Sequence, residues 1–281
     1  MTEGLPAGGR DALDEEPLGD QEQHTTQSKA SARSEHPDGL GALIARASVL
    51  DRAEELHRGN GASQVDVFII GVTGGIGGLL AQKLRSRGDA VHGLVRRDDQ
   101  QAELARRGVN AQVGDLAGMS VEQLATAFGD VDVIVFSAGS NGGSREVTTA
   151  VDGDGVVKAI KAARLAGVER FVLVSVLPES WRERDLGDEV EYYFAVKKGA
   201  DVALSRSDLN WLILRPSLLL DGPGTGTVSL GPAEFHGEIT RDDVAATLAE
   251  LLHEPRIGRQ ILELNTGSTP IEEAVLANVR T

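Results

Sequence analysis

From Val65 onward, short apolar segments alternate with segments whose apolar residues recur at helical spacing. Several of the apolar segments are continuous runs of valine, isoleucine and leucine, which is typical of strands that helices cover on both faces. The alternation predicts an α/β fold, a doubly wound parallel sheet with right-handed crossovers in a single domain. The expected strands are residues 65–71, 90–96, 110–116, 131–139, 170–177, 210–217 and 260–266, and the expected helices are residues 76–87, 98–107, 120–128, 151–166, 191–206 and 240–254.

The N-terminal part of the chain follows no such pattern. Residues 1–39 are rich in Gly, Ser, Gln, Asp and Glu and contain almost no large apolar residues, a composition that predicts a disordered, acidic tail. Residues 40–64 carry a rough helical stripe, which indicates either a helix that docks on the domain or on a partner, or a partly ordered linker. The folded domain is expected to span residues 65–281.

The segment VFIIGVTGGIGGLLAQKL, residues 67–84, passes from the first strand into a helix through Gly71, Gly74 and Gly77. Each glycine costs about 0.5–1 kcal/mol in a regular element, so a compensating function is expected. In a strand–turn–helix unit the first glycine permits the tight turn, the second lets a pyrophosphate approach the main chain, and the third lets the helix pack closely. The helix N-terminus then offers N–H groups to the phosphates. We therefore predict a dinucleotide site in a Rossmann fold; the alternative is a purely structural turn.

The residues after the second strand bear on the choice of cofactor. An acidic residue at this point usually binds the ribose 2′-hydroxyl of NAD, whereas this chain reads LVRRDDQ, with Arg96 and Arg97. A guanidinium can bind a 2′-phosphate through two parallel hydrogen bonds, so NADP is the expected cofactor. Two alternatives stay open: the arginines are a solvated helix start, or Asp98 binds a ribose and NAD is used.

Seven segments stand in the order typical of the atypical short-chain dehydrogenases/reductases: Gly71–Gly77, Val95–Arg97, Gly114–Leu116, Ser137–Gly139, Ala166–Ser175, Tyr193–Lys197 and Leu214–Pro216. More narrowly, residues 65–280 resemble the NAD(P)H-binding, sugar-epimerase-like branch that includes relatives of flavin and biliverdin reductases. The resemblance implies a set of cofactor contacts. They are Gly71, Thr73, Gly74, Gly75, Ile76, Gly77, Arg96, Arg97, Asp115, Leu116, Ser137, Ala138, Gly139, Ser175, Lys197, Pro216 and Ser217.

The same resemblance implies a catalytic pair, Tyr193 and Lys197, four residues apart on one helix face. The lysine ammonium is expected to lower the pKa of the tyrosine and to bind the nicotinamide ribose, while the tyrosine acts as acid or base. Tyr192 and Lys198 offer competing registers, and a surface helical pair without catalytic function is a further alternative.

One position departs from the family pattern. Beyond the fifth strand, where a Ser or Thr normally binds the substrate carbonyl, the chain reads Ser175-Val176-Leu177, so the hydroxyl lies too early. The catalytic triad is therefore expected to be incomplete. Flavins, quinones and tetrapyrroles tolerate this better than simple carbonyl compounds, because hydride enters a conjugated ring and the proton can come from solvent.

Composition narrows the remaining choices. The chain has no cysteine, and its six histidines show no metal-ligand spacing, so no metal site is expected. A net charge of −15 argues against nucleic-acid or anionic-membrane partners. No apolar run approaches the roughly 18 residues of a membrane helix, and the N-terminus does not resemble a signal peptide, so a cytoplasmic protein with a small-molecule substrate is expected.

About 64 residues follow Ser217, which is too few for a large sugar-nucleotide subdomain. Within them, Thr240 is the expected N-cap of the last predicted helix, with Asp242 and Asp243 in its first turn. The sequence thus favours an NADP(H)-dependent oxidoreductase. Two alternatives are a non-catalytic NADP(H)-binding redox sensor and, less favoured, a nucleotide-sugar epimerase or dehydratase.

Overall fold

The computed structural model describes residues 64–178 and 185–280 of the chain. The predicted tail, residues 1–39, and nearly all of the predicted helix or linker, residues 40–64, lie outside the described residues. The boundaries expected for these two segments therefore stay predictions.

A nine-stranded sheet forms the centre of the described residues, in the order β11-β8-β10-β6-β5-β4-β1-β2-β3. All seven predicted strands are present and run parallel, whereas β8 pairs antiparallel with β10 and β11. The strands are β1 (Asp66–Ile70), β2 (Ala90–Val95), β3 (Asn110–Val113), β4 (Val133–Phe136), β5 (Arg170–Val174), β6 (Asn210–Pro216), β8 (Thr227–Gly231), β10 (Gln260–Thr266) and β11 (Thr269–Pro270).

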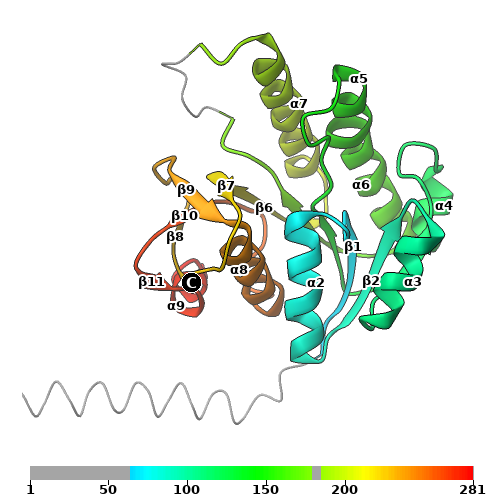
Figure 1. The fold of residues 1–281 in the computed structure, drawn as a ribbon, viewed down its shortest axis with the longest axis horizontal. Helices are drawn as coiled ribbons and strands as arrows, with labels where there is room; N and C mark the ends of the chain where they lie inside the picture. The colour runs from blue at the N-terminus through cyan, green and yellow to red at the C-terminus, as the bar shows by residue number, and fades with distance from the viewer. Residues whose placement is uncertain (1–63, 179–184, 281) are drawn as a thin grey trace, which may run out of the picture. The chain divides into compact units, whose positions relative to one another are not determined.

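Helices cover both faces of this sheet (Figure 1). Side chains of β1 alternate between the two resulting cores: Val67 and Ile69 pack toward α2, α3, α8 and α9, and Phe68 and Ile70 pack toward α4, α6 and α7. The helices are α2 (Gly75–Arg87), α3 (Asp98–Arg106), α4 (Val121–Phe128), α6 (Asp154–Ala166), α7 (Asp188–Ser205), α8 (Arg241–His253) and α9 (Ile271–Leu276). The predicted Rossmann-like α/β fold is confirmed. No helix in residues 64–178 or 185–280 is long and apolar enough to cross a membrane.

The strand order places a topological switch point at β1. Successive strands β2 and β3 extend the sheet on one side of β1, and β4, β5 and β6 extend it on the other. At the carboxyl end of β1, Ile70 pairs with Leu94 of β2 and with Phe136 of β4. Ligands of open parallel sheets bind outside the carboxyl ends of the strands at this point.

Several elements differ from the predicted ones. The helix expected over residues 151–166 begins earlier, at Arg145, and consists of α5 (Arg145–Thr148), the π-helix η1 (Thr149–Gly153) and α6. The strand expected to reach residue 139 ends at Phe136. Apolar periodicity does not register a change of helix type.

The C-terminal region contains elements that the pattern did not predict. Strands β7 (Leu218–Leu220) and β9 (Glu238–Thr240) form a separate two-stranded sheet, and β8, β11 and α9 complete the main sheet edge. Each is only two to six residues long, too short to generate a periodic signal. The predicted N-cap of α8 is confirmed, since Thr240 Oγ1 accepts a hydrogen bond from the Asp243 N–H at 3.0 Å.

Candidate active site

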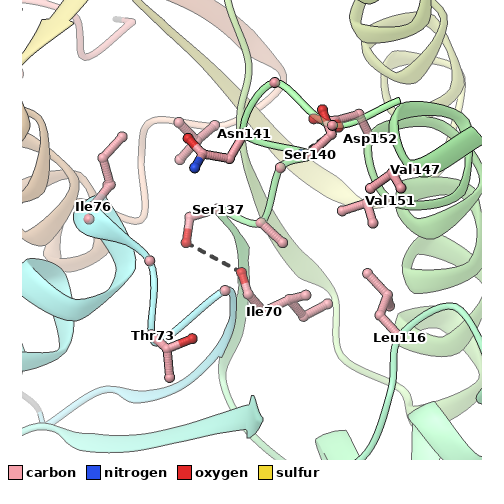
Figure 2. A pocket seen from close by; sticks show the side chains of 18 of the residues that line it. Ile70, Thr73, Ile76, Leu116, Ser137, Ser140, Asn141, Val147, Val151 and Asp152 are labelled. Atoms are coloured by element: carbon pink, nitrogen blue, oxygen red, sulfur yellow. Dashed lines mark hydrogen bonds between the residues drawn. The ribbon is translucent and has the colours of Figure 1, made fainter. Parts of the chain in front are cut away.

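A cleft of ≈ 880 Å³ lies at the carboxyl ends of strands β1 to β6 (Figure 2). Its volume falls within the range of about 300–1,000 Å³ that small-molecule and cofactor sites occupy. Most of the predicted site residues meet here although they come from six strand ends and helix α7. Those that line the cleft are Gly71, Thr73, Gly74, Gly75, Ile76, Arg96, Asp115, Leu116, Ser137, Ala138, Gly139, Ser175, Tyr193, Lys197, Pro216 and Ser217.

The glycine loop has the geometry that close backbone approach requires. Gly71 has a φ of +96°, and a Cβ on it would lie 2.5 Å from the backbone nitrogen of Ala138. Gly74 is the N-cap of α2 and supplies no side-chain hydrogen bond, so the first N–H groups of the helix are left without a side-chain cap at the edge of the cleft. The loop therefore exposes the donors that a phosphate needs.

Gly77 does not line the cleft but serves the packing role predicted for the third glycine. A Cβ on it would overlap the Gly71 carbonyl oxygen and lie 2.8 Å from Ser137 Oγ. Ser137 Oγ in turn donates to the carbonyl of Ile70 at 3.3 Å, as Figure 2 shows. Strand β1, helix α2 and the end of β4 thus touch at a point that admits no side chain.

The two predicted 2′-phosphate ligands are placed differently. Arg96 lines the cleft, and its guanidinium makes no hydrogen bond or ion pair with other described residues. Arg97 lies outside the cleft lining: it is the N-cap residue of α3, and its side chain, 60% exposed, forms an ion pair with Asp99 at 2.9 Å. Of the two arginines the structure places only Arg96 in the cleft lining, because adjacent residues at a strand end point in opposite directions. The role predicted for Arg97 at the 2′-phosphate stays a prediction.

Lys197 lies at the other end of the cleft and is almost completely buried, at 3% exposure. Its ammonium donates to the Val174 carbonyl at 3.0 Å and lies 3.6 Å from Oδ1 of the fully buried Asp152. Burial lowers the pKa of Lys197, and the carboxylates of Asp152 and Asp201 oppose this shift. Asp152 belongs to the π-helix η1, and short π-helical segments are frequent at functional sites. No sequence signal identified Asp152 as a site residue.

Tyr193 lines the same cleft, and its hydroxyl makes no hydrogen bond with the other described residues. Burial raises the pKa of Tyr193, and the charge of Asp152 raises it further. Both effects are opposite in sign to the lowering of the Tyr193 pKa expected from Lys197, which is not among the causes of the shift. The neutral phenol is the favoured form.

Tyr192, the alternative to Tyr193 as the tyrosine of the predicted pair, points away from the cleft. Its hydroxyl shares a hydrogen bond with Thr149 Oγ1, and the guanidinium of Arg145 lies 4.9 Å from the centre of its ring. Tyr192 does not line the cleft, whereas Tyr193 and Lys197 do. The spacing of four residues places only the predicted pair in the cleft.

Two buried polar atoms at the cleft lack a hydrogen bond of ordinary length among the described residues: Asp152 Oδ1, which lies 3.6 Å from the Lys197 ammonium, and Ser175 Oγ, which interacts with the Asp201 carboxylate. Such atoms are rare, because an unpaired buried polar group costs about 1–3 kcal/mol. Both residues line the cleft, next to Lys197. Together with the glycine loop they fit a ligand that carries phosphates at one end and hydroxyl groups at the other, as a nicotinamide dinucleotide does. Val176 also lines the cleft, as expected from the apolar residue at the usual serine position.

Several cleft residues were not predicted. Asn141, with a φ of +50°, lies in a loop after β4, and its Asn-Gly-Gly sequence is a turn signal that could have identified the loop. Val147 and Val151 form an apolar wall beside Leu116 (Figure 2). Arg241, the first residue of α8, reaches the cleft from a segment 170 residues away from Gly71 along the chain, and no local pattern indicates this.

Residues 71–255 match the model of a family described as NAD(P)H-binding. The chain belongs to this family. Its predicted likeness to an NAD(P)H-binding branch with epimerase-like and reductase members is confirmed.

Relatives of this NAD(P)H-binding protein match over most of its length. A protein named uncharacterized sugar epimerase YhfK, from Bacillus subtilis, is 39% identical over 211 residues, which are 74% of this chain and 98% of YhfK. A solved structure of a putative NAD-dependent epimerase/dehydratase from Bacillus halodurans is 30% identical, with a TM-score of 0.69 over 76% of this chain and 99% of that one. The structure of ChuY, an anaerobilin reductase from Escherichia coli O157:H7, is 28% identical, with a TM-score of 0.61 over 72% and 97%.

Proposed function

We propose that this protein is an NADP(H)-dependent oxidoreductase that transfers hydride to a small-molecule acceptor. The observation that carries the proposal is that one cleft is lined by the glycine loop at one end and by Tyr193 and Lys197 at the other. The E. coli relative that is a reductase supports the same class of reaction. When bound, the reduced nicotinamide supplies the hydride.

The residues of the chain divide the task of binding the cofactor. The uncapped N–H groups of α2 would hold the pyrophosphate, and Arg96 would hold the 2′-phosphate, since its guanidinium has no other partner among the described residues. Lys197 would donate to the nicotinamide ribose, with its ammonium oriented by the Val174 carbonyl and Asp152. Pro216 and Ser217 would border the carboxamide.

Tyr193 would supply the proton that accompanies hydride transfer. Its phenol is neutral, so the O–H bond breaks as the acceptor takes the proton, and the resulting phenolate recovers a proton from water. Val176 provides no hydroxyl to polarise a carbonyl. The proposed acceptors are therefore conjugated molecules such as flavins, quinones or tetrapyrroles, which accept hydride without that hydrogen bond.

Cofactor choice can be tested with two adjacent arginines. The affinities for NADPH and NADH are measured by fluorescence titration of the wild type, Arg96→Gln and Arg97→Gln. Because a charged hydrogen bond contributes about 1.5–3 kcal/mol, Arg96→Gln should reduce NADPH affinity about 10-fold or more while NADH affinity changes little. Arg97→Gln is the matched control and should leave both affinities unchanged. Equal wild-type affinity for NADPH and NADH would reject the NADP assignment.

The reaction itself can be tested by following NADPH oxidation at 340 nm with flavins, quinones and small carbonyl compounds. Tyr193→Phe should lower turnover with an accepted substrate and leave the affinity for NADPH unchanged. An unchanged turnover would reject the role of Tyr193 as proton donor.

A second candidate is an NADP(H)-binding redox sensor without catalysis. It is favoured by Val176 at the usual serine position, which leaves the family's catalytic set without its hydroxyl there. A sensor should bind NADPH but oxidise it with none of the acceptors, and it should capture a partner in pull-downs only with one redox form of the cofactor. Turnover that depends on Tyr193 would exclude this candidate.

A nucleotide-sugar epimerase or dehydratase is a third candidate, and the names of two relatives support it. The region after β6 weighs against it, because α8 and β10 belong to the central fold and the remaining elements are short. Conversion of a nucleotide sugar by the purified protein, followed by chromatography, would establish this activity in place of the oxidoreductase.

A further inference from the structure

Arg241 lies directly over the start of the phosphate-binding helix. It is the first residue of α8, which packs side by side with α2 (Figure 1). A Cβ on Gly75 would lie 2.8 Å from Cδ and 3.2 Å from Nε of Arg241. The Arg241 side chain thus packs directly against the bare backbone of Gly75, where a side chain at residue 75 would force it to shift.

The guanidinium of Arg241 has a single, weakly held partner in the described residues. Its Nη1 donates to Asp221 Oδ1 at 2.8 Å, and the Asp221 side chain is 92% exposed. An ion pair with so exposed a carboxylate contributes little, because water competes for both charges. A ligand that brings a better-buried anion to the same place can displace Asp221.

The acidic residues next to Arg241 are committed elsewhere. Asp242 forms an ion pair with Lys83 at 2.7 Å, and Asp243 accepts backbone hydrogen bonds from Thr225 and Gly226 at 2.9 Å each. Neither carboxylate is left to neutralise the arginine. Arg241 thus holds a positive charge at the helix end where the partial charge of the α2 dipole is also positive.

We propose that Arg241 is a ligand of the cofactor's pyrophosphate and that it exchanges Asp221 for the phosphate oxygens when the cofactor binds. The planar guanidinium suits two parallel hydrogen bonds to phosphate and adds a full positive charge to the N–H groups of the helix end. The inference rests on the proposed function only in that a nicotinamide dinucleotide is the ligand. It does not depend on NADP over NAD or on catalysis.

The test compares affinities for NADPH and NADH in Arg241→Ala, Arg241→Lys, Asp221→Asn and the wild type. Since both cofactors contain the pyrophosphate, Arg241→Ala should weaken both by the same factor, about 10-fold to 100-fold. Arg241→Lys should recover part of this loss, because lysine keeps the positive charge but lacks the planar pair of N–H donors of the guanidinium. Asp221→Asn should strengthen both by up to about fivefold, because Arg241 no longer has to leave a charged partner.

These outcomes separate the inference from the proposed function. If the wild type binds neither cofactor, the proposed function is wrong and the inference goes with it. If the wild type binds but Arg241→Ala binds both equally well, only the inference is overturned. A loss confined to NADPH would also overturn it, because the arginine would then contact the 2′-phosphate. Asp221 lies on the surface, so its variant gives a result even if Arg241→Ala does not fold.

Discussion

The buried pair of Lys197 and Asp152 provides a quantitative test of the site's electrostatics. Lys197→Met keeps the apolar stem and removes the ammonium, leaving the fully buried Asp152 carboxylate with the N–H of Ser140 at 2.8 Å. Asp201, the other nearby carboxylate, keeps its ion pair with Arg215 at 2.9 Å. The substitution thus isolates one unpaired buried charge.

The size of the effect follows from the geometry. At the observed 3.6 Å, the gross attraction between the two charges is about 4–5 kcal/mol at an effective dielectric constant of about 20. The cost of burying both charges cancels much of this attraction, so the intact pair adds little net stability. Removing one partner leaves the burial cost of the other unopposed, and Lys197→Met should lower the free energy of unfolding by about 3–5 kcal/mol.

Urea unfolding followed by circular dichroism measures this on Lys197→Met, Asp152→Asn and the double variant. The double variant should lose less than the sum of the single losses, by about 2 kcal/mol, because it contains no unpaired charge. The control is Arg106→Met, whose ion pair with Glu103 is exposed and should contribute less than about 0.5 kcal/mol. Additive losses at Lys197 and Asp152 would refute the electrostatic interpretation of the pair.

Two further predictions concern Tyr193 and the loop between β7 and β8. In Tyr192→Phe, Tyr193 is the sole tyrosine, and ultraviolet titration should place its pKa above the usual 10.0. Because the fold favours the neutral phenol, the free energy of unfolding should fall as the pH rises past 10.0. A titration midpoint of Tyr193 at or below 10.0 would contradict this. Asp243→Asn replaces a carboxylate that accepts hydrogen bonds from the N–H groups of Thr225 and Gly226, so the new amide NH₂ faces one of these N–H donors. Urea unfolding should show a loss of about 1–3 kcal/mol in the free energy of unfolding. An unchanged unfolding midpoint would show that Asp243 does not anchor this loop.

Local patterns predicted the fold and the glycine loop. The apolar runs of β1, β4 and β5 indicate strands, because helices cover both faces of the sheet and the side chains on both faces are buried. Gly71 and Gly77 marked the turn because the bare backbone they leave is a local property of the chain. The spacing of Tyr193 and Lys197 similarly followed from helix geometry, which needs no information from the rest of the molecule.

Tertiary structure decided what local spacing does not encode. Asp152 and Arg241 reach the cleft through the packing of η1 and α8, so their roles depend on contacts between distant segments. The same holds for Arg96 and Arg97: the side chains are chemically identical, but only Arg96 points into the cleft, while Arg97 pairs with Asp99 at the surface. The pKa of Tyr193 moved opposite to the predicted direction, since desolvation and the charge of Asp152 exist only once the chain is folded. The sequence by itself determined which elements form and where the chain turns, whereas burial and long-range charge, which arise only from packing, decided how the site's groups ionise and pair.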